Sequence, residues 1–288
     1  DFNALFVLLT WLLLIAMGIG SNIRWKKDSR PLLGVGMVIA VSSLVLAAIV
    51  AYFVSPSSML NIGVTLAVSF WVLLWMVIDF RDKTKNAPSL LKGLSQLRLS
   101  YWGQQVAHIG VLVAVIGVAF VTTLSIESDV AMAEGDTVNV QGYDFTLVDF
   151  REIKGSNYDA TQAHVQVTKN GRDVATLDPE KRTYIISTMP TTEAAIDASL
   201  MRDLYVALGE PIAEGSNEWA LRIYVKPLIR WIWLGAIIMA LGGLISMLDR
   251  RYRIKTSKSA LFVSDVADSM DSMDLDQPAV TVPVVGER

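Results

Sequence analysis

The stretch RLSYWGQQVAHIGVLVAVIGVAF, residues 98–120, carries one histidine, His108, inside a mostly apolar run. From Trp102 onward the run contains no charged side chain and continues to Leu124, which is long enough for a bilayer-spanning helix of roughly 20 residues. Lipid cannot satisfy backbone polar groups, so a segment that crosses it is expected to be helical. The stretch therefore predicts a transmembrane helix over residues 102–124 that holds an ionisable side chain.

Four other stretches are similarly long and apolar and have no Lys or Arg in their centres: residues 2–20, 31–54, 62–80 and 228–248. The 288-residue chain is 52% hydrophobic and 18% charged, whereas soluble domains contain about 25% charged residues. These features predict an α-helical integral membrane protein with about five transmembrane helices. Three of them are expected within residues 1–80, the fourth at 102–124 and the fifth within 224–250.

Basic residues lie next to three of the predicted spans. They follow the first, third and fifth spans, whereas the connection SPSSMLN between the second and third spans has none. The positive-inside rule then places the basic segments, including a loop at residues 81–101, in the cytoplasm. The same rule places residues 125–223 on the outer side of the membrane, opposite the cytoplasm. Since orientation in the membrane is the simplest role of these basic segments, they do not indicate a nucleic-acid-binding protein.

Residues 125–223 differ from the rest of the chain because they are acidic and their apolar residues alternate, as in half-buried strands. Asn170-Gly171 lies between two alternating runs, which is the signal of a type I′ hairpin. Residues 191–211 are compatible with a helix or with strands, and we favour strands with a tight turn near Leu200. A small antiparallel β-domain inserted between the last two spans is predicted. The acidic, Pro-containing residues 251–288 are expected to form a disordered cytoplasmic tail.

His108 has a structural and a functional interpretation. In the structural one it forms a hydrogen bond to a carbonyl, Ser or Thr of a neighbouring helix, in a non-catalytic scaffold or transporter component. In the functional one it is a ligand or proton relay, because ionisable residues inside membranes are candidates for function, and haem iron commonly takes one or two imidazoles. A second axial imidazole would have to come from outside this chain, since no other predicted span has a histidine.

The other histidine, His164, lies in the alternating run AHVQV, where a structural role in a strand is expected. The chain has no cysteine, which excludes disulfides, thiolate metal sites and thiol catalysis by this chain alone. Walker, GxGxxG, HExxH and GxSxG motifs are also absent from the sequence. The sequence therefore assigns no catalytic residue, and the catalytic residues stay unknown.

Several segments resemble, in order, the C-terminal portion of the CcmF/NrfE family of cytochrome c-type biogenesis proteins: RLSYWGQQVAHIGVLVAVIGV, PEKRTYIIS, TEAAID, DLYVALGE and KPLIRWIWLGAIIMALGGLISMLDRRYR. The resemblance covers roughly residues 1–254. It implies a part of a haem lyase, or cytochrome c synthase, that carries a transmembrane haem b. His108 then corresponds to one of the two axial ligands of the haem iron.

The resemblance also implies partners: a CcmE-like haem chaperone, a CcmH-like thiol-handling subunit, and apocytochrome c, whose Cys-x-x-Cys-His thiols receive the haem. The family's other transmembrane histidine and its tryptophan-rich WWD segment are not in this sequence. The chain is therefore expected to be a truncated or split form that needs the missing N-terminal half of the same protein. By itself it is expected to be inactive, and specificity of the CcmF or the NrfE type is left open.

Overall fold

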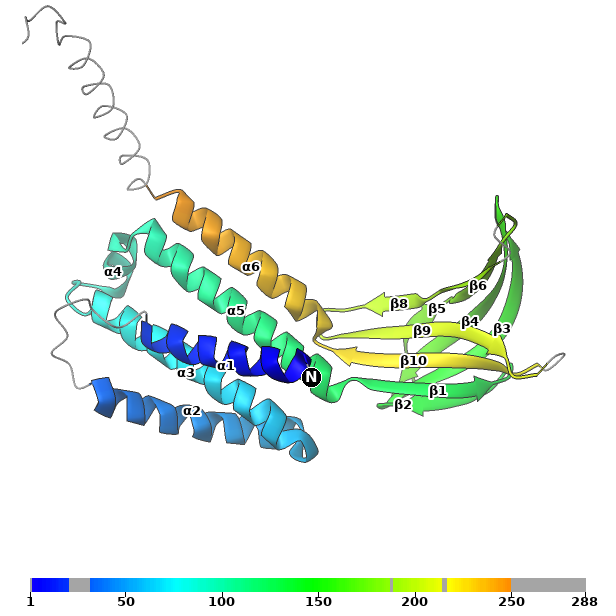
Figure 1. Cartoon of the computed structure of the whole chain (residues 1–288), viewed down its shortest axis with the longest axis horizontal. Coiled ribbons are helices and arrows are strands. Elements are labelled where there is room, and N and C mark those ends of the chain that lie inside the picture. Colours follow the sequence, from blue (N-terminus) through cyan, green and yellow to red (C-terminus); the bar gives the residue numbers. More distant parts are fainter. Residues whose placement is uncertain (1, 21–31, 187–188, 214–216, 250–288) are drawn as a thin grey trace, which may run out of the picture.

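The computed structural model describes residues 2–20, 32–186, 189–213 and 217–249. The chain forms a bundle of helices at one end and a β-sandwich at the other, as Figure 1 shows. The predicted tail after residue 250 and the basic residues that follow the first predicted span lie outside the described residues. The predicted fold class, a helical membrane protein with an inserted antiparallel β-domain, is confirmed.

The helical part consists of α1 (Phe2–Gly20), α2 (Leu32–Val54), the 3₁₀ helix η1 (Pro56–Ser58), α3 (Met59–Thr84), α4 (Leu90–Gln96), α5 (Leu99–Leu124) and α6 (Ile229–Met247). Among the described residues, four helical segments are long and apolar enough to cross a membrane: Gly34–Val54, Pro56–Thr84, Leu99–Leu124 and Ile229–Met247. The first predicted span forms α1, in which Val7–Gly20 is a shorter apolar segment.

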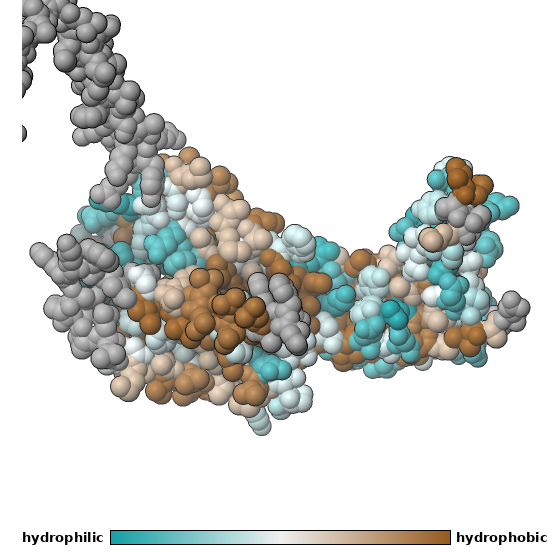
Figure 2. Space-filling view, viewed as in Figure 1, coloured by the Kyte–Doolittle hydropathy of each residue, from teal (hydrophilic) through white to brown (hydrophobic). Residues whose placement is uncertain are grey.

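Apolar side chains cover much of the outer surface of these helices, whereas the surface of the sandwich is more polar (Figure 2). Phe53 on α2 is 80% exposed and Leu60 on α3 is 78% exposed. Monomeric soluble proteins rarely expose apolar patches of such extent, so this surface fits contact with lipid or with other membrane helices. The chain is a multi-pass membrane protein.

The segment that we expected to be a loop, residues 81–101, is largely helical. α3 continues to Thr84, α5 already begins at Leu99, and the short helix α4 lies between them. The side chain of Ser89 accepts a hydrogen bond from the backbone N–H of Lys92 at 3.3 Å and so caps the start of α4. Ser is a preferred N-cap residue, so Ser89 was a local helix signal that the loop prediction missed.

α5 and α6 pack backbone to backbone through glycines. A Cβ atom at Gly110 would lie 2.5 Å from the backbone nitrogen of Met239, and one at Gly242 would lie 2.5 Å from that of Ala107. Small residues allow membrane helices to approach this closely. We call the glycines of this contact the glycine seam: Gly103, Gly110 and Gly117 on α5, and Gly235 and Gly242 on α6.

The β-domain is a sandwich of two antiparallel sheets. Its strands are β1 (Ile126–Met132), β2 (Thr137–Val140), β3 (Tyr143–Lys154), β4 (Tyr158–Lys169), β5 (Arg172–Leu177), β6 (Glu180–Tyr184), β7 (Pro190–Glu193), β8 (Ala195–Ala198), β9 (Arg202–Pro211) and β10 (Trp219–Pro227). One sheet has the order β1-β10-β9-β8; the other has the order β2-β3-β4-β6-β7, with β5 paired to β4. The core between the sheets includes fully buried side chains from both: Met132, Phe145, Leu147, Leu204, Leu208 and Ile223.

Two local predictions within the sandwich are confirmed. Asn170 and Gly171, between β4 and β5, both have positive φ angles, 52° and 73°, as a type I′ hairpin turn requires. Residues 191–211 form strands rather than a helix, and β8 and β9 pair across a turn that contains Leu200. The alternating burial of β9 decides this, because Leu204, Val206 and Leu208 all point into the core.

The sandwich is joined to the bundle by single residues. Ser125 lies between α5 and β1, and Leu228 lies between β10 and α6. β1 and β10 pair with each other from Ile126 opposite Val225 onward, so the two strands continue directly from the two helices, as Figure 1 shows. The backbone N–H of Leu228 donates to the carbonyl of Met201 at 3.0 Å and holds this junction closed.

Candidate functional site

His108 lies on a polar face of α5, near the N-terminal end of this helix. At about 100° per residue, His108 lies about 140–180° around the helix from the glycines of the seam on α5. Gln104 lies one turn before His108 on the same face, and Tyr101 lies about two turns before it. Because the seam is docked on α6, the polar face is turned away from the contact between α5 and α6.

The His108 side chain is half-buried, and its Nδ1 atom is buried with no hydrogen-bond partner among the described residues. The structural interpretation requires such a hydrogen-bond partner on a neighbouring helix. Gln105, which is 7% exposed, likewise has a buried Nε2 atom without a partner in the described part of the chain. A buried polar atom that makes no hydrogen bond costs free energy. Both atoms are enclosed by the chain's own residues, so an external ligand would have to approach His108 through its other ring nitrogen, Nε2.

A polar pocket of about 760 Å³ lies at the start of α5. Its lining combines two cations with hydroxyl and amide groups: Lys83, Arg98, Ser100, Tyr101, Gln104 and Ser246. These residues come from the end of α3, the start of α5 and the end of α6. Gln96, at the end of α4, also lines it. The ends of α3, α4 and α6 and the start of α5 therefore form one basic pocket on the side of α5 that carries Gln104 and Tyr101.

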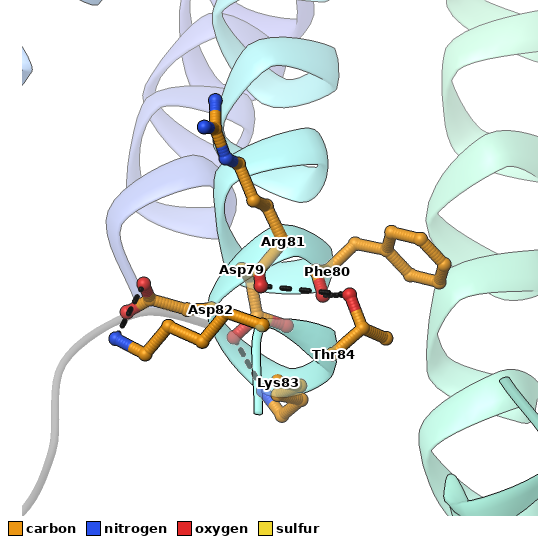
Figure 3. Close-up of polar contacts among 7 residues, drawn as sticks. Asp79, Phe80, Arg81, Asp82, Lys83 and Thr84 are labelled. Carbon is orange, nitrogen blue, oxygen red and sulfur yellow. Dashed lines mark hydrogen bonds and ion pairs between the residues drawn. The ribbon is translucent and has the colours of Figure 1, made fainter. Parts of the chain in front are cut away.

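A partly buried ion pair supports one wall of this pocket. Asp79, on α3, is 6% exposed and forms a salt bridge with Lys83 one turn further along the helix (Figure 3). The Lys83 Nζ atom also lies 4.7 Å from the centre of the Tyr101 ring. Sequence analysis missed this cluster, although an acid and a base four residues apart on a predicted helix would have indicated the pair.

His164 is separate from this site and lies on β4 of the sandwich. Its Nδ1 atom is 2.6 Å from Asp178 Oδ1, and Asp149 is its partner residue on β3. Within the described residues, no group of three or more His, Asp or Glu side chains could hold a metal ion. His164 is therefore a strand residue whose ring contacts a carboxylate, and the structure does not bring it together with His108.

A second pocket, of about 490 Å³, lies on the outer face of the β1-β10-β9-β8 sheet, and sequence analysis missed it as well. Tyr205 and Tyr224 meet edge to face there, with ring centres 5.2 Å apart. Arg222 binds Asp129 through two hydrogen bonds of 2.7 and 3.0 Å, and this contact lowers the pKa of the exposed Asp129 carboxyl. The pocket thus pairs an aromatic surface with an ionised rim.

Comparisons with known proteins agree with this architecture. A family model described as the CcmF C-terminal beta-sandwich matches residues 123–227. The cytochrome c-type biogenesis protein CcmF of Pseudomonas fluorescens is 42% identical over 255 residues. The chain is a relative of the CcmF-type cytochrome c biogenesis proteins.

Other relatives extend the comparison. CcmF of Escherichia coli K12 is 36% identical over 260 residues, and the cytochrome c-type biogenesis protein NrfE of Haemophilus influenzae is 31% identical over 251. The alignments to these two proteins and to the Pseudomonas protein cover 87% to 89% of this chain but 38% of each relative. A solved structure titled cytochrome c heme lyase CcmF superposes with a TM-score of 0.69 at 18% identity, over 86% of this chain and 40% of that one. The chain thus resembles part of these proteins in fold and in sequence.

The residues present fit one half of a bis-imidazole haem site. His108 offers an imidazole at membrane depth whose Nδ1 atom is without a hydrogen bond to any described residue. The chain has two histidines in all, and the other one, His164, is on β4. A second axial imidazole for such a site would lie outside these 288 residues.

Proposed function

We propose that this chain is part of a cytochrome c haem lyase and that His108 is one of two axial ligands of a transmembrane haem b. The observation that carries the proposal is the imidazole of His108, which makes no hydrogen bond to a described residue and lies on a helix within the part aligned with the CcmF-type relatives. Its Nδ1 atom is enclosed by the chain's own atoms, so the nitrogen that would bind iron is Nε2. A structural histidine would be expected to donate to a neighbouring helix. An axial ligand needs one ring nitrogen that makes no hydrogen bond. The packing of α5 on the glycine seam turns His108 away from α6, so α6 offers it no such bond.

The second axial imidazole is proposed to come from a polypeptide that corresponds to the N-terminal half of the relatives. When bound, haem b supplies one-electron redox chemistry whose potential depends on the axial ligands and their surroundings. The residues of this chain contribute the orientation of one imidazole and the exclusion of water around it. The glycine seam fixes the helix that carries the imidazole.

The proposed reaction is transfer of haem from a CcmE-like haem chaperone to apocytochrome c, assisted by a CcmH-like thiol-handling subunit. We place the chain in the bacterial inner membrane with its sandwich in the periplasm, because apocytochrome thiols are kept reduced and modified on that side. The acidic sandwich is proposed as a docking surface that attracts basic partners at low salt. Binding that does not change between low and high salt would contradict this role.

Reporter fusions test the orientation. Alkaline phosphatase fused at Ser57, in η1, or at Gly171, in the β4–β5 hairpin, should be active, and the same reporter at Lys83 should be inactive. The positive-inside rule gives this expectation, because Lys83 belongs to a basic segment and the other two positions do not. Activity at Lys83 together with inactivity at Gly171 would reverse the orientation.

The haem proposal is tested by His108→Ala in the host's own membranes, with His164→Ala as the matched control. We expect His108→Ala to remove the b-type absorption associated with this protein and to abolish cytochrome c maturation, while the chain remains in the membrane. His164→Ala should change neither. His108→Gly with added imidazole should restore part of the absorption by filling the vacated ligand position. Normal absorption in His108→Ala would contradict the proposal and favour a scaffold or transporter component.

A further inference from the structure

The basic pocket at the start of α5 faces the same way as His108. Measured along the helix, Gln104 is about 6 Å and Tyr101 about 10 Å from His108, at about 1.5 Å per residue. Both residues line the pocket, and both lie on the face of α5 that carries His108. A ligand held at His108 can therefore extend along this face toward the pocket without crossing the glycine seam.

The pocket has the character of an anion site. Arg98 is exposed and has no ion pair among the contacts of the described residues, whereas Lys83 is paired with Asp79. The second carboxylate nearby, Asp249, accepts a hydrogen bond from the backbone N–H of Ser100 at 3.0 Å. With each of the two carboxylates already engaged, the Arg98 guanidinium is left to bind an external anion, beside the hydroxyl groups of the pocket.

Haem carries two carboxylates on one edge of its ring, and both are ionised at neutral pH. Ionised groups are costly within hydrocarbon, so these carboxylates have to reach a polar region. From His108, the pocket is the polar region that lies on the same face of α5. Cationic donors bind carboxylates through strong, charge-assisted hydrogen bonds, and Arg suits them best because its donors form a planar fork.

We propose that this pocket binds the propionate carboxylates of the haem whose iron is held by His108, with Arg98 as the principal cation and Lys83 as the second. The inference rests on the proposed function, since it assigns a further binding region for the same haem. A phospholipid phosphate has similar chemistry, and basic pockets between transmembrane helices do bind anionic headgroups. The shared face with His108 favours the haem, and the lipid is an outcome of the test.

The test uses the chain tagged in its own host, purified from membranes together with any polypeptide that supplies the second imidazole. Arg98→Gln removes the unpaired cation. Lys83→Gln is combined with Asp79→Asn so that no buried charge is left alone. The matched control is Lys92→Gln, which removes an exposed cation of α4 that does not line the pocket. Two properties are measured: the rate at which haem passes to excess apomyoglobin, and the midpoint potential of the bound haem.

Arg98→Gln should lose haem about fivefold faster than the unmodified protein, which is the upper range for one partly exposed ion pair. Its midpoint potential should fall, because a nearby cation disfavours the more positive ferric state. The Lys83→Gln/Asp79→Asn protein should show a smaller loss, and Lys92→Gln should show none.

The outcomes separate the two proposals. Haem that depends on His108 but is lost no faster in either pocket variant would overturn the pocket assignment alone. The same holds if Arg98→Gln removes co-purified phosphatidylglycerol and leaves haem release unchanged, since the pocket is then a lipid site. If the unmodified protein binds no haem that depends on His108, the proposed function and this inference both fail.

Discussion

The substitution Gly110→Ala tests how closely the packing of α5 on α6 controls the candidate site. A Cβ atom at Gly110 would lie 2.5 Å from the backbone nitrogen of Met239 and 2.7 Å from the carbonyl oxygen of Gly235. Ordinary van der Waals contact begins near 3.4 Å. Because the obstructing atoms belong to the backbone, no side-chain rotation can relieve the overlap. The two helices would have to separate locally by about 1 Å, with loss of the dispersion contacts along the seam.

Such overpacking costs about 1–3 kcal/mol in well-packed interiors. For a chain of this size, 1 kcal/mol corresponds to about 2–4 °C in the midpoint of thermal unfolding, so we expect Gly110→Ala to unfold about 2–12 °C lower. The matched control is Gly243→Ala, also on a helix of this pair, where a Cβ atom would have nothing within 4 Å. The assay is thermal unfolding of the detergent-solubilised chain, followed by intrinsic tryptophan fluorescence.

The same substitution should affect haem. His108 is two residues from Gly110, so a separation of α5 from α6 displaces the imidazole as well. In host membranes, Gly110→Ala should retain less b-type haem than Gly243→Ala. Equal unfolding midpoints for the two variants would refute the view that the seam sets the position of α5. A lower midpoint with full haem retention would show that the seam stabilises the helices without orienting His108.

Two further predictions concern the sandwich. Phe145→Ala removes a fully buried side chain from its core and should lower the free energy of unfolding by about 3–5 kcal/mol, measured as the urea dependence of proteolysis within residues 123–227; Val148→Ala, on the same strand but 43% exposed, is the control and should change little. The contact with Arg222 lowers the pKa of Asp129. The stabilisation by the ionised Asp129 carboxylate is therefore present above the unfolded pKa of about 3.9, and it is lost as the pH falls through the lower folded pKa. Asp129→Asn should therefore be slightly less stable near neutral pH, and the difference should vanish in acid; a difference that grows as the pH falls would contradict the assignment.

Much of the architecture followed from the sequence because its physical signals are local. Uninterrupted apolar runs without basic residues predict spans, and the Asn170-Gly171 pair predicts a turn that requires two positive φ angles. The stretch at 191–211 was harder, because its Ala and Leu content suits a helix. The burial of alternate residues of β9 against the opposite sheet overrode that propensity, which is a tertiary effect that composition does not reveal.

The candidate site was predicted only in part. His108 stands out in the sequence because an ionisable residue inside an apolar span is rare. The basic pocket does not stand out, since Lys83, Arg98 and Ser246 come from three helices whose meeting depends on how the helices pack. The pairing of Tyr205 with Tyr224 across β9 and β10 depends in the same way on strand register. Sequence spacing identifies neighbours on one helix or strand, and these groups are neighbours only through the fold.

The connection between the sandwich and the membrane bundle bears on the proposed role of both. β1 and β10 pair with each other and continue, after one residue each, from α5 and into α6. The junction is further held by a hydrogen bond from Arg230 Nε to Asp203 Oδ1 at 3.1 Å and by one from Gln141 Nε2 to the carbonyl of Leu124 at 3.3 Å. The helix that carries His108 thus leads into an edge strand of the sandwich without a flexible linker. A partner that tilts the sandwich must also move the end of α5 and the start of α6, or break these contacts. In a protein proposed to receive haem outside the membrane and to hold a haem within it, this continuity gives the outer domain a mechanical connection to the imidazole.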